Sequence, residues 1–69
     1  MVRRRLLEDA LETQNKGLID LARELGISKS SLYQRLNGRV LFRIDELQKI
    51  KDYLNLDISK FRDIFFSDM

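Results

Sequence analysis

Apolar side chains recur along this chain at intervals of three and four residues, and no segment alternates apolar and polar residues with a period of two. The first spacing gathers apolar side chains on one face of an α-helix, whereas half-buried strands need the second. The pattern therefore predicts an all-α domain, a compact bundle of about five short helices. The expected helices cover about residues 3–14, 18–25, 29–36 and 45–54, and a last one presents Ile58, Phe61, Ile64 and Phe65.

Residues typical of helix ends separate these segments. Four sites favour the left-handed conformation that ends a helix, and they follow the first four helices in order: Gly17, Gly26, Asn37-Gly38 and Asn55. Ser28 is a favourable N-cap for the third helix, because its hydroxyl can accept a hydrogen bond from a free backbone N–H. Either Asp57 or Ser59 can cap the last helix in the same way.

The most informative stretch is Leu18–Asn37, where a turn of about three residues joins two short helices. Gly26 can adopt the positive φ that a sharp turn requires. Ala22 is small, so the following helix can pack close against it. This is the spacing of a helix-turn-helix, in which the second helix enters the major groove of DNA.

The helix at 29–36 carries a polar face without acidic residues. Leu32 and Leu36 define its buried direction, and at 100° per residue Ser30 and Gln34 point most directly away from it. The face is completed by three flanking residues, Lys29, Ser31 and Tyr33. It offers an amide that can bond adenine through two hydrogen bonds, together with hydroxyl, ammonium and phenol groups.

Charge is unevenly distributed over the 69 residues, which suffice for a single domain spanning 1–69. The formal net charge is +2, but residues 1–43 carry nine basic and five acidic side chains, and residues 44–69 carry four and six. Between Leu25 and Arg43 there are four bases and no acid. A one-sided basic stretch indicates a polyanionic partner.

Composition argues against an enzyme and against a cofactor or metal. The chain has neither cysteine nor histidine, and it has no glycine-rich phosphate loop or room for a substrate pocket. We expect the later acidic residues to form a solvated face, since they lack calcium-loop spacing; they are Asp45, Glu46, Asp52, Asp57, Asp63 and Asp68. No targeting or membrane-spanning segment is apparent, so we expect a cytoplasmic protein. The lack of catalytic residues and of a pocket predicts that it has no small-molecule substrate.

The chain resembles the XRE family, the helix-turn-helix of phage Cro and lambda-type repressors, at Leu21-Ala22-x3-Gly26-Ile27-Ser28-x3-Leu32-x3-Leu36-Asn37-Gly38. Small phage-encoded regulators of Gram-positive bacteria are similar to it further along, at Phe42-x3-Glu46-Leu47-x2-Ile50-x3-Leu54 and at the ending Ile64-Phe65-Phe66. The likeness covers about Leu18–Phe66. It implies a lambda-repressor-like bundle that binds double-stranded DNA.

The resemblance also indicates which residues of this chain stand at the family's DNA-contacting positions. The family's base-reading positions fall on Lys29, Ser30 and Gln34. Its phosphate-contacting positions after the recognition helix fall on Asn37 and Arg39. The wider set of flanking or phosphate-contacting candidates is Ser28, Ser31, Tyr33, Arg35, Asn37, Arg39 and Arg43.

Three positions depart from the family pattern. Gly17 and Leu18 stand where the family usually has Thr and Gln, so the phosphate contact of that Gln is missing. Arg35 occupies a position that is usually apolar, and the apolar residue has moved to Leu36, which leaves Arg35 free for a phosphate. Arg43 replaces the usual Ser or Thr cap of the fourth helix; a phosphate contact by Arg43 would explain the loss of that cap.

The leading interpretation is a sequence-specific transcriptional regulator of phage or prophage type, with the helix at 29–36 in the major groove. The alternative is a protein-interaction module of antitoxin or anti-repressor type that uses the same fold against another protein. Any homodimer should be weak and should form mainly on DNA. Phe66 is the candidate dimer contact, because it cannot point inward together with Phe65; otherwise it packs over the end of the first helix.

Two further features have alternative interpretations. Residues 3–5 are three consecutive arginines, which form either a basic arm on DNA or a solvated first helical turn. Tyr33 either touches a sugar-phosphate or a thymine methyl group, or is a half-buried aromatic that covers the second helix.

Overall fold

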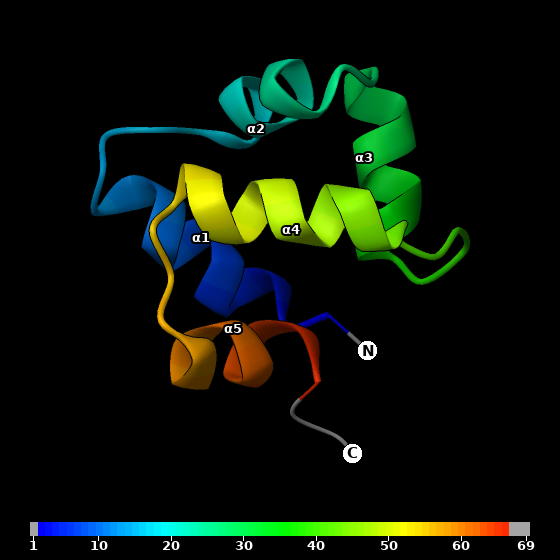
Figure 1. Ribbon diagram of the computed structural model, residues 1–69. Coiled ribbons are helices and arrows are strands. Elements are labelled where there is room, and N and C mark those ends of the chain that lie inside the picture. Colours follow the sequence, from blue (N-terminus) through cyan, green and yellow to red (C-terminus); the bar gives the residue numbers. More distant parts are fainter. Residues whose placement is uncertain (1, 67–69) are drawn as a thin grey trace.

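The computed structural model describes residues 2–66 and contains five α-helices joined by short loops, with no strand among those residues. The helices are α1 (Arg4–Glu12), α2 (Leu18–Leu25), α3 (Lys29–Leu36), α4 (Ile44–Tyr53) and α5 (Ile58–Phe65), as Figure 1 shows. The all-α class and all five segments are therefore confirmed. The first helix is slightly shorter at both ends than the sequence predicts.

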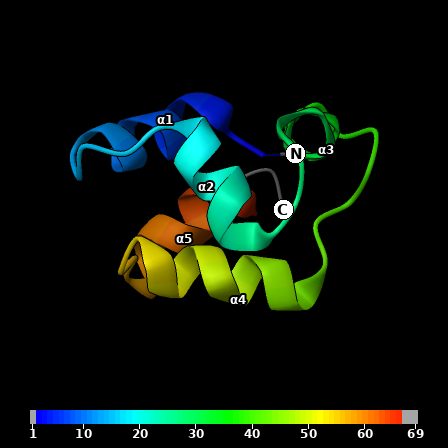
Figure 2. The same cartoon turned by 90° about the horizontal axis from the view of Figure 1, so that it is seen from above.

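The helices surround one core, and α4 runs along one side of the molecule, in front of the other helices in Figure 1 and along one edge in Figure 2. α2 packs on α4, α1 packs on α5, and α3 packs chiefly on α2. α3 therefore stands at one edge of the molecule, which the view from above also shows (Figure 2). The core comprises Leu7, Ala10, Leu11, Leu21, Ala22, Leu25, Leu32, Leu36, Ile50, Leu54, Leu56, Ile64 and Phe65.

The turns on both sides of α3 have the expected chemistry. Gly26 has φ +71°, and the N–H of Ile27 donates to the carbonyl of Ala22 at 3.1 Å. Gly38 has φ +81°, and the N–H of Arg39 donates to the carbonyl of Gln34 at 3.0 Å. In both turns a left-handed glycine lets the chain reverse while it satisfies the last helical carbonyls. The positive φ at Gly26 and the stop at Asn37-Gly38 are thus confirmed.

The end of α1 differs from the prediction. Asn15, with φ +57°, adopts the left-handed conformation, whereas Gly17 is extended at φ −122° and ψ 178°. Asn15 can do this because asparagine tolerates the left-handed region better than most residues. Gly17 instead lies at the N-cap of α2, where its N–H donates to Oδ2 of Asp20 at 2.8 Å.

α5 begins at the expected cap but buries only Ile64 and Phe65 of its four expected apolar residues, with Phe61 partly buried against the core. Oδ1 of Asp57 accepts a hydrogen bond from the N–H of Lys60 at 2.7 Å, so Asp57 and not Ser59 is the N-cap. Ile58 is 67% exposed rather than part of the core. As the first residue of α5 it projects back toward the N-terminal end of the helix, beyond the packed face.

Four phenylalanines, Phe42, Phe61, Phe65 and Phe66, form an aromatic cluster around the C-terminal end of α5. The ring of Phe65 is buried and meets Phe42 edge-on at 5.6 Å, while Phe66 is 39% exposed and lies 5.9 Å from Phe61. The neighbours diverge as expected for adjacent helical positions. The backbone N–H of Arg3 donates to the carbonyl of Ile64 at 2.7 Å, which ties the start of α1 to α5.

Candidate nucleic-acid interface

α3 presents its polar face to solvent and its apolar face to the core. Leu32 is fully buried and Leu36 is 4% exposed, whereas Lys29, Ser30 and Gln34 are all exposed. The three residues expected to read bases therefore lie on one accessible surface of a single helix. No acidic side chain occurs on α3 itself.

The start of α3 is fixed by local hydrogen bonding. Ser28 has the extended backbone of an N-cap, and its Oγ accepts a hydrogen bond from the N–H of Ser31 at 3.0 Å. The capping role of Ser28 is confirmed. The left-handed Gly26 precedes this cap and sets the angle between α2 and α3, so the orientation of the polar face follows from residues 26–28.

Tyr33 is half-buried and packs against the core, with two cations close to its ring. The guanidinium of Arg4 lies 5.0 Å from the ring centroid, and the ammonium of Lys29 lies 5.6 Å from it. Arg4 also forms a 3.2 Å ion pair with Glu8. Within the free protein Tyr33 is thus a packing residue at the α1–α3 boundary, and the arginines at 3–5 lie at the start of α1 rather than in an extended arm.

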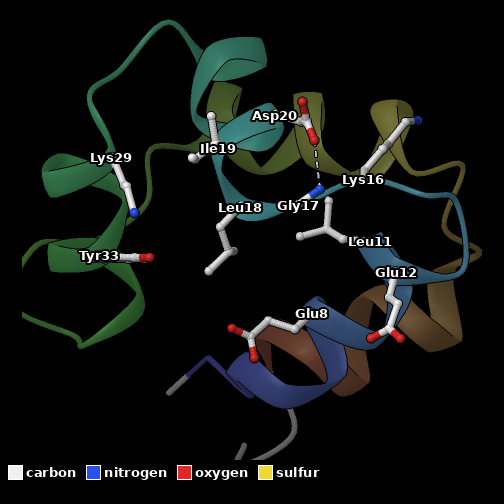
Figure 3. Close-up of a pocket in the computed structure, with 10 residues that line it drawn as sticks. All are labelled: Glu8, Leu11, Glu12, Lys16, Gly17, Leu18, Ile19, Asp20, Lys29 and Tyr33. Carbon is white, nitrogen blue, oxygen red and sulfur yellow. Dashed lines mark hydrogen bonds between the residues drawn. The ribbon is translucent and has the colours of Figure 1, made fainter.

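Beside Tyr33 an open hollow of about 730 Å³ separates α3 from α1 and the start of α2. Figure 3 shows Lys29 and Tyr33 on one wall, Leu18 between them and α1, and Glu8 on the opposite wall. The hollow contains carboxylates from three positions, Glu8, Glu12 and Asp20. Lys29 is therefore the base-reading candidate that borders acidic side chains, whereas Ser30 and Gln34 do not line this hollow.

The expectation that Arg35 is free for a phosphate is wrong. Its Nε lies 2.9 Å from Oε1 of Glu46, and its Nη1 donates to the carbonyl of Ser31 at 3.1 Å. The side chains of Arg35 and Glu46 are only 14% and 8% exposed. Arg35 is held by the buried carboxylate that α4 supplies beside it, so its guanidinium is not free.

The expectation that Glu46 belongs to a solvated face is wrong for the same reason. Its Oε1 also accepts a hydrogen bond from the backbone N–H of Arg43 at 2.9 Å, which caps the start of α4. Burial alone would raise the pKa of the Glu46 carboxyl. The hydrogen bonds from Arg35 and Arg43 and the charge of Arg35 outweigh burial, so the pKa lies below its ordinary value.

The loop between α3 and α4 carries the remaining flanking candidates on the surface. Asn37, Arg39 and Arg43 are all exposed. The guanidinium of Arg43 lies 3.2 Å from Oδ1 of Asp45 in a solvent-exposed ion pair. Such a pair contributes little stability and is easily exchanged for another anion. Arg39 has no ion pair among residues 2–66.

Sequence patterns did not single out Val40 and Leu41 of this loop, or Ile44 at the start of α4, as surface residues. Leu41 and Ile44 are 84% and 86% exposed, and Val40 is 39% exposed. Val40 and Leu41 line a hollow of about 220 Å³ together with Phe66. A signal was present, because these residues fall outside the helical periodicity that predicts the core. Exposed apolar side chains clustered in this way are typical of contact surfaces.

Within residues 2–66 no cluster of three or more acidic side chains could hold a metal ion. Those residues also form no helix of the length and apolarity that crossing a membrane requires.

A family model described as helix-turn-helix matches residues 7–61, from within α1 to the middle of α5, and covers the whole candidate interface. No curated protein and no solved structure matches the chain.

Proposed function

Because the chain belongs to the XRE-type helix-turn-helix family, a family of DNA-binding regulators, we propose that it is a sequence-specific regulator that inserts α3 into the major groove of double-stranded DNA. The observation that carries the proposal is the exposed, acid-free face of α3 directly opposite the buried Leu32. An ordinary solvated helix face mixes acidic and basic residues, and acidic side chains on a face that enters the groove would repel phosphate.

Within this proposal the residues divide by task. Ser30 and Gln34 read base edges, and Lys29 adds a base contact together with general attraction for the DNA. Arg39 and Arg43 contact phosphates on one side of the recognition helix, and Arg43 exchanges Asp45 for a phosphate when it binds. Asn37, whose side chain is exposed, is a further flanking contact at this end of the helix. Ser28 and Ser31 are flanking contacts at its other end. Tyr33 contributes through packing.

A second copy of the chain would bind the adjacent half-site. Half-sites of helix-turn-helix dimers lie about one DNA turn, roughly 34 Å, apart. The protein measures 28 × 27 × 21 Å along its principal axes, so two copies at that spacing meet through surface side chains only. The contact would be small and the dimer weak without DNA. Phe66, with Val40 and Leu41 beside it, is the exposed apolar surface available for this contact.

We assign the regulator to a phage or prophage setting and to the bacterial cytosol, where its DNA target lies. The similarity of Leu18–Phe66 to small phage-encoded regulators supports the assignment. Neither a cofactor nor a catalytic activity is part of the proposal.

Selection of bound sequences from a random duplex library tests this function. We expect a palindromic consensus, and binding to it that is at least about 10³-fold tighter than binding to random duplex. Binding to random duplex should weaken steeply as salt increases, because phosphate contacts release counterions. If no duplex is bound at low salt, the function is wrong, and the protein-interaction alternative takes its place.

A further inference from the structure

The loop from 37 to 43 is held at both of its ends by hydrogen bonds. At its start, the carbonyl of Gln34 accepts from the N–H groups of Arg39 and Val40 at 3.0 and 3.2 Å. At its end, Oε1 of Glu46 accepts from the N–H of Arg43 at 2.9 Å. The loop that carries the exposed arginines therefore has fixed attachment points on α3 and on α4.

Arg35 connects these two attachment points. It lies on α3 immediately after Gln34, and its guanidinium bonds the same Glu46 oxygen that holds Arg43. A second guanidinium nitrogen bonds the carbonyl of Ser31, one helical turn earlier. The planar guanidinium thus joins the backbone of α3 to the first turn of α4. α3 otherwise packs chiefly on α2, so this ion pair is a direct polar link from the recognition helix to α4.

We propose that Arg35 and Glu46 are positioning residues for base reading, which hold the C-terminal end of α3 and the Arg39–Arg43 loop in one fixed geometry relative to Gln34. Neither residue touches DNA in this role. The pair sets where the phosphate-binding arginines lie when the base-reading side chains are in the groove. The inference rests on the proposed DNA-binding function and deepens it.

A pair that only stabilised the fold would behave differently from a positioning pair. Replacing a buried ion pair by uncharged residues of similar volume is often neutral or even stabilising. The double variant Arg35→Met/Glu46→Gln removes both charges and leaves the net charge of the protein unchanged. It also retains an amide oxygen at residue 46 that can accept from the N–H of Arg43. Its stability and its specificity are therefore separable.

The measurement is the specificity ratio, the dissociation constant for random duplex divided by that for the selected site. Both constants are obtained by titration at a temperature where melting curves show every variant folded. We expect the double variant to lose at least about fivefold in this ratio, the lower end of what one base contact contributes. Glu46→Gln alone should lose less, because its amide oxygen can still accept from both N–H groups. A ratio for the double variant that changes by less than fivefold overturns the inference.

Two further variants keep the test decisive. Arg23→Met removes an arginine that is 76% exposed on α2, and it should leave the ratio unchanged. If the double variant does not fold, Arg35→Lys replaces it, because lysine keeps the charge beside Glu46 but lacks the rigid fork of arginine. An unchanged ratio for Arg35→Lys then overturns the inference. Failure of the native protein to bind any site would contradict the proposed function itself, which is a separate result.

Discussion

The side-chain amide of Gln14 donates a 2.7 Å hydrogen bond to the carbonyl oxygen of Leu54, forty residues further along the chain. The ammonium of Lys16 lies 3.5 Å from the carbonyl oxygen of Tyr53 and 4.2 Å from the centre of its ring. The loop between α1 and α2 thus satisfies carbonyls at the C-terminal end of α4, where a cation is also favoured by the helix dipole. A loop that precedes the helix-turn-helix therefore stabilises a helix that follows it.

Replacement of Gln14 by alanine should destabilise the fold by about 0.5–1.5 kcal/mol, the usual net contribution of one hydrogen bond. Denaturant unfolding measures the free-energy change. Gln48→Ala is the matched control, because Gln48 bonds only the exposed Asp52 side chain at 3.0 Å and should cost less than about 0.5 kcal/mol. Equal losses in the two variants would mean that the cap on α4 adds nothing beyond a surface contact.

The turn before α3 should depend on the backbone of Gly26 rather than on space around it. No heavy atom lies within 4 Å of the position that a Cβ would take, but φ is +71°. Gly26→Val should therefore lower the free energy of unfolding by about 1–3 kcal/mol through strain alone. Gly26→Asn, which tolerates the left-handed region, should cost clearly less. A melting temperature unaffected by valine would contradict the strain argument.

Base reading and phosphate binding should separate when one residue of each kind is removed. Gln34→Ala should cost about 1–3 kcal/mol on the selected site, relax the preference at one base pair, and barely change binding to random duplex. Arg39→Ala should weaken binding to every duplex and make the salt dependence shallower by about one unit of slope. Ser30 and Lys29 should behave more like Gln34, with a partial general effect at Lys29. Titrations on two duplexes at several salt concentrations decide this.

If Gln34→Ala and Arg39→Ala weakened specific and random binding to the same extent, the outward face of α3 would not be the base-reading surface.

The lowered pKa of Glu46 predicts how its contribution to stability depends on pH. Because the pKa is lower in the folded protein than the ordinary value of 4.5, folding favours the ionised carboxylate. The stability that this preference contributes is complete above about pH 4.5, and it is lost as the pH falls through the lowered folded value. Glu46→Gln cannot ionise. The stability difference between the native protein and Glu46→Gln should therefore shrink on acidification, as measured by urea unfolding across this range.

Assembly on DNA should depend on Phe66. The free protein should sediment as a monomer at micromolar concentration, and two copies should bind a palindromic duplex cooperatively. Phe66→Ser should reduce the cooperative free energy by about 1–2 kcal/mol, as expected for an aromatic residue central to a small contact. Ile58→Ser removes an exposed apolar residue at the start of α5 and should leave cooperativity unchanged. A tight dimer in solution that survives Phe66→Ser would remove this assignment.

Local features of this fold were predictable because their causes lie within a few residues. Gly26 and Gly38 each follow directly on the helix that they end, and glycine readily adopts the left-handed backbone found there. Ser28 caps a helix whose first turn follows it directly. The outward face of α3 follows from the spacing of two leucines. The prediction at Gly17 was wrong because two residues near the end of α1 tolerate positive φ, and the pattern could not rank Asn15 above Gly17.

The errors at the candidate site have a different origin. The burial of Glu46 and the pairing of Arg35 depend on how α3 packs relative to α4, across eleven residues of sequence. The apolar residues of α4 predict which face of the helix is buried, but they give no reason for a carboxylate such as Glu46 to be buried beside that face. Only the tertiary arrangement brings a guanidinium and a backbone N–H to the same oxygen atom.

The position of α3 at the edge of the molecule has a consequence for how the protein opens. α3 rests chiefly on α2, whereas α4 contributes the fully buried Ile50 to the core, so the amide hydrogens of α3 should exchange with solvent before those of α4. The helix proposed to enter the groove is then the one that can loosen while the rest of the bundle stays intact. Local opening of that kind would break the Arg35–Glu46 pair, so the fixed geometry proposed for base reading belongs to the closed state of the domain.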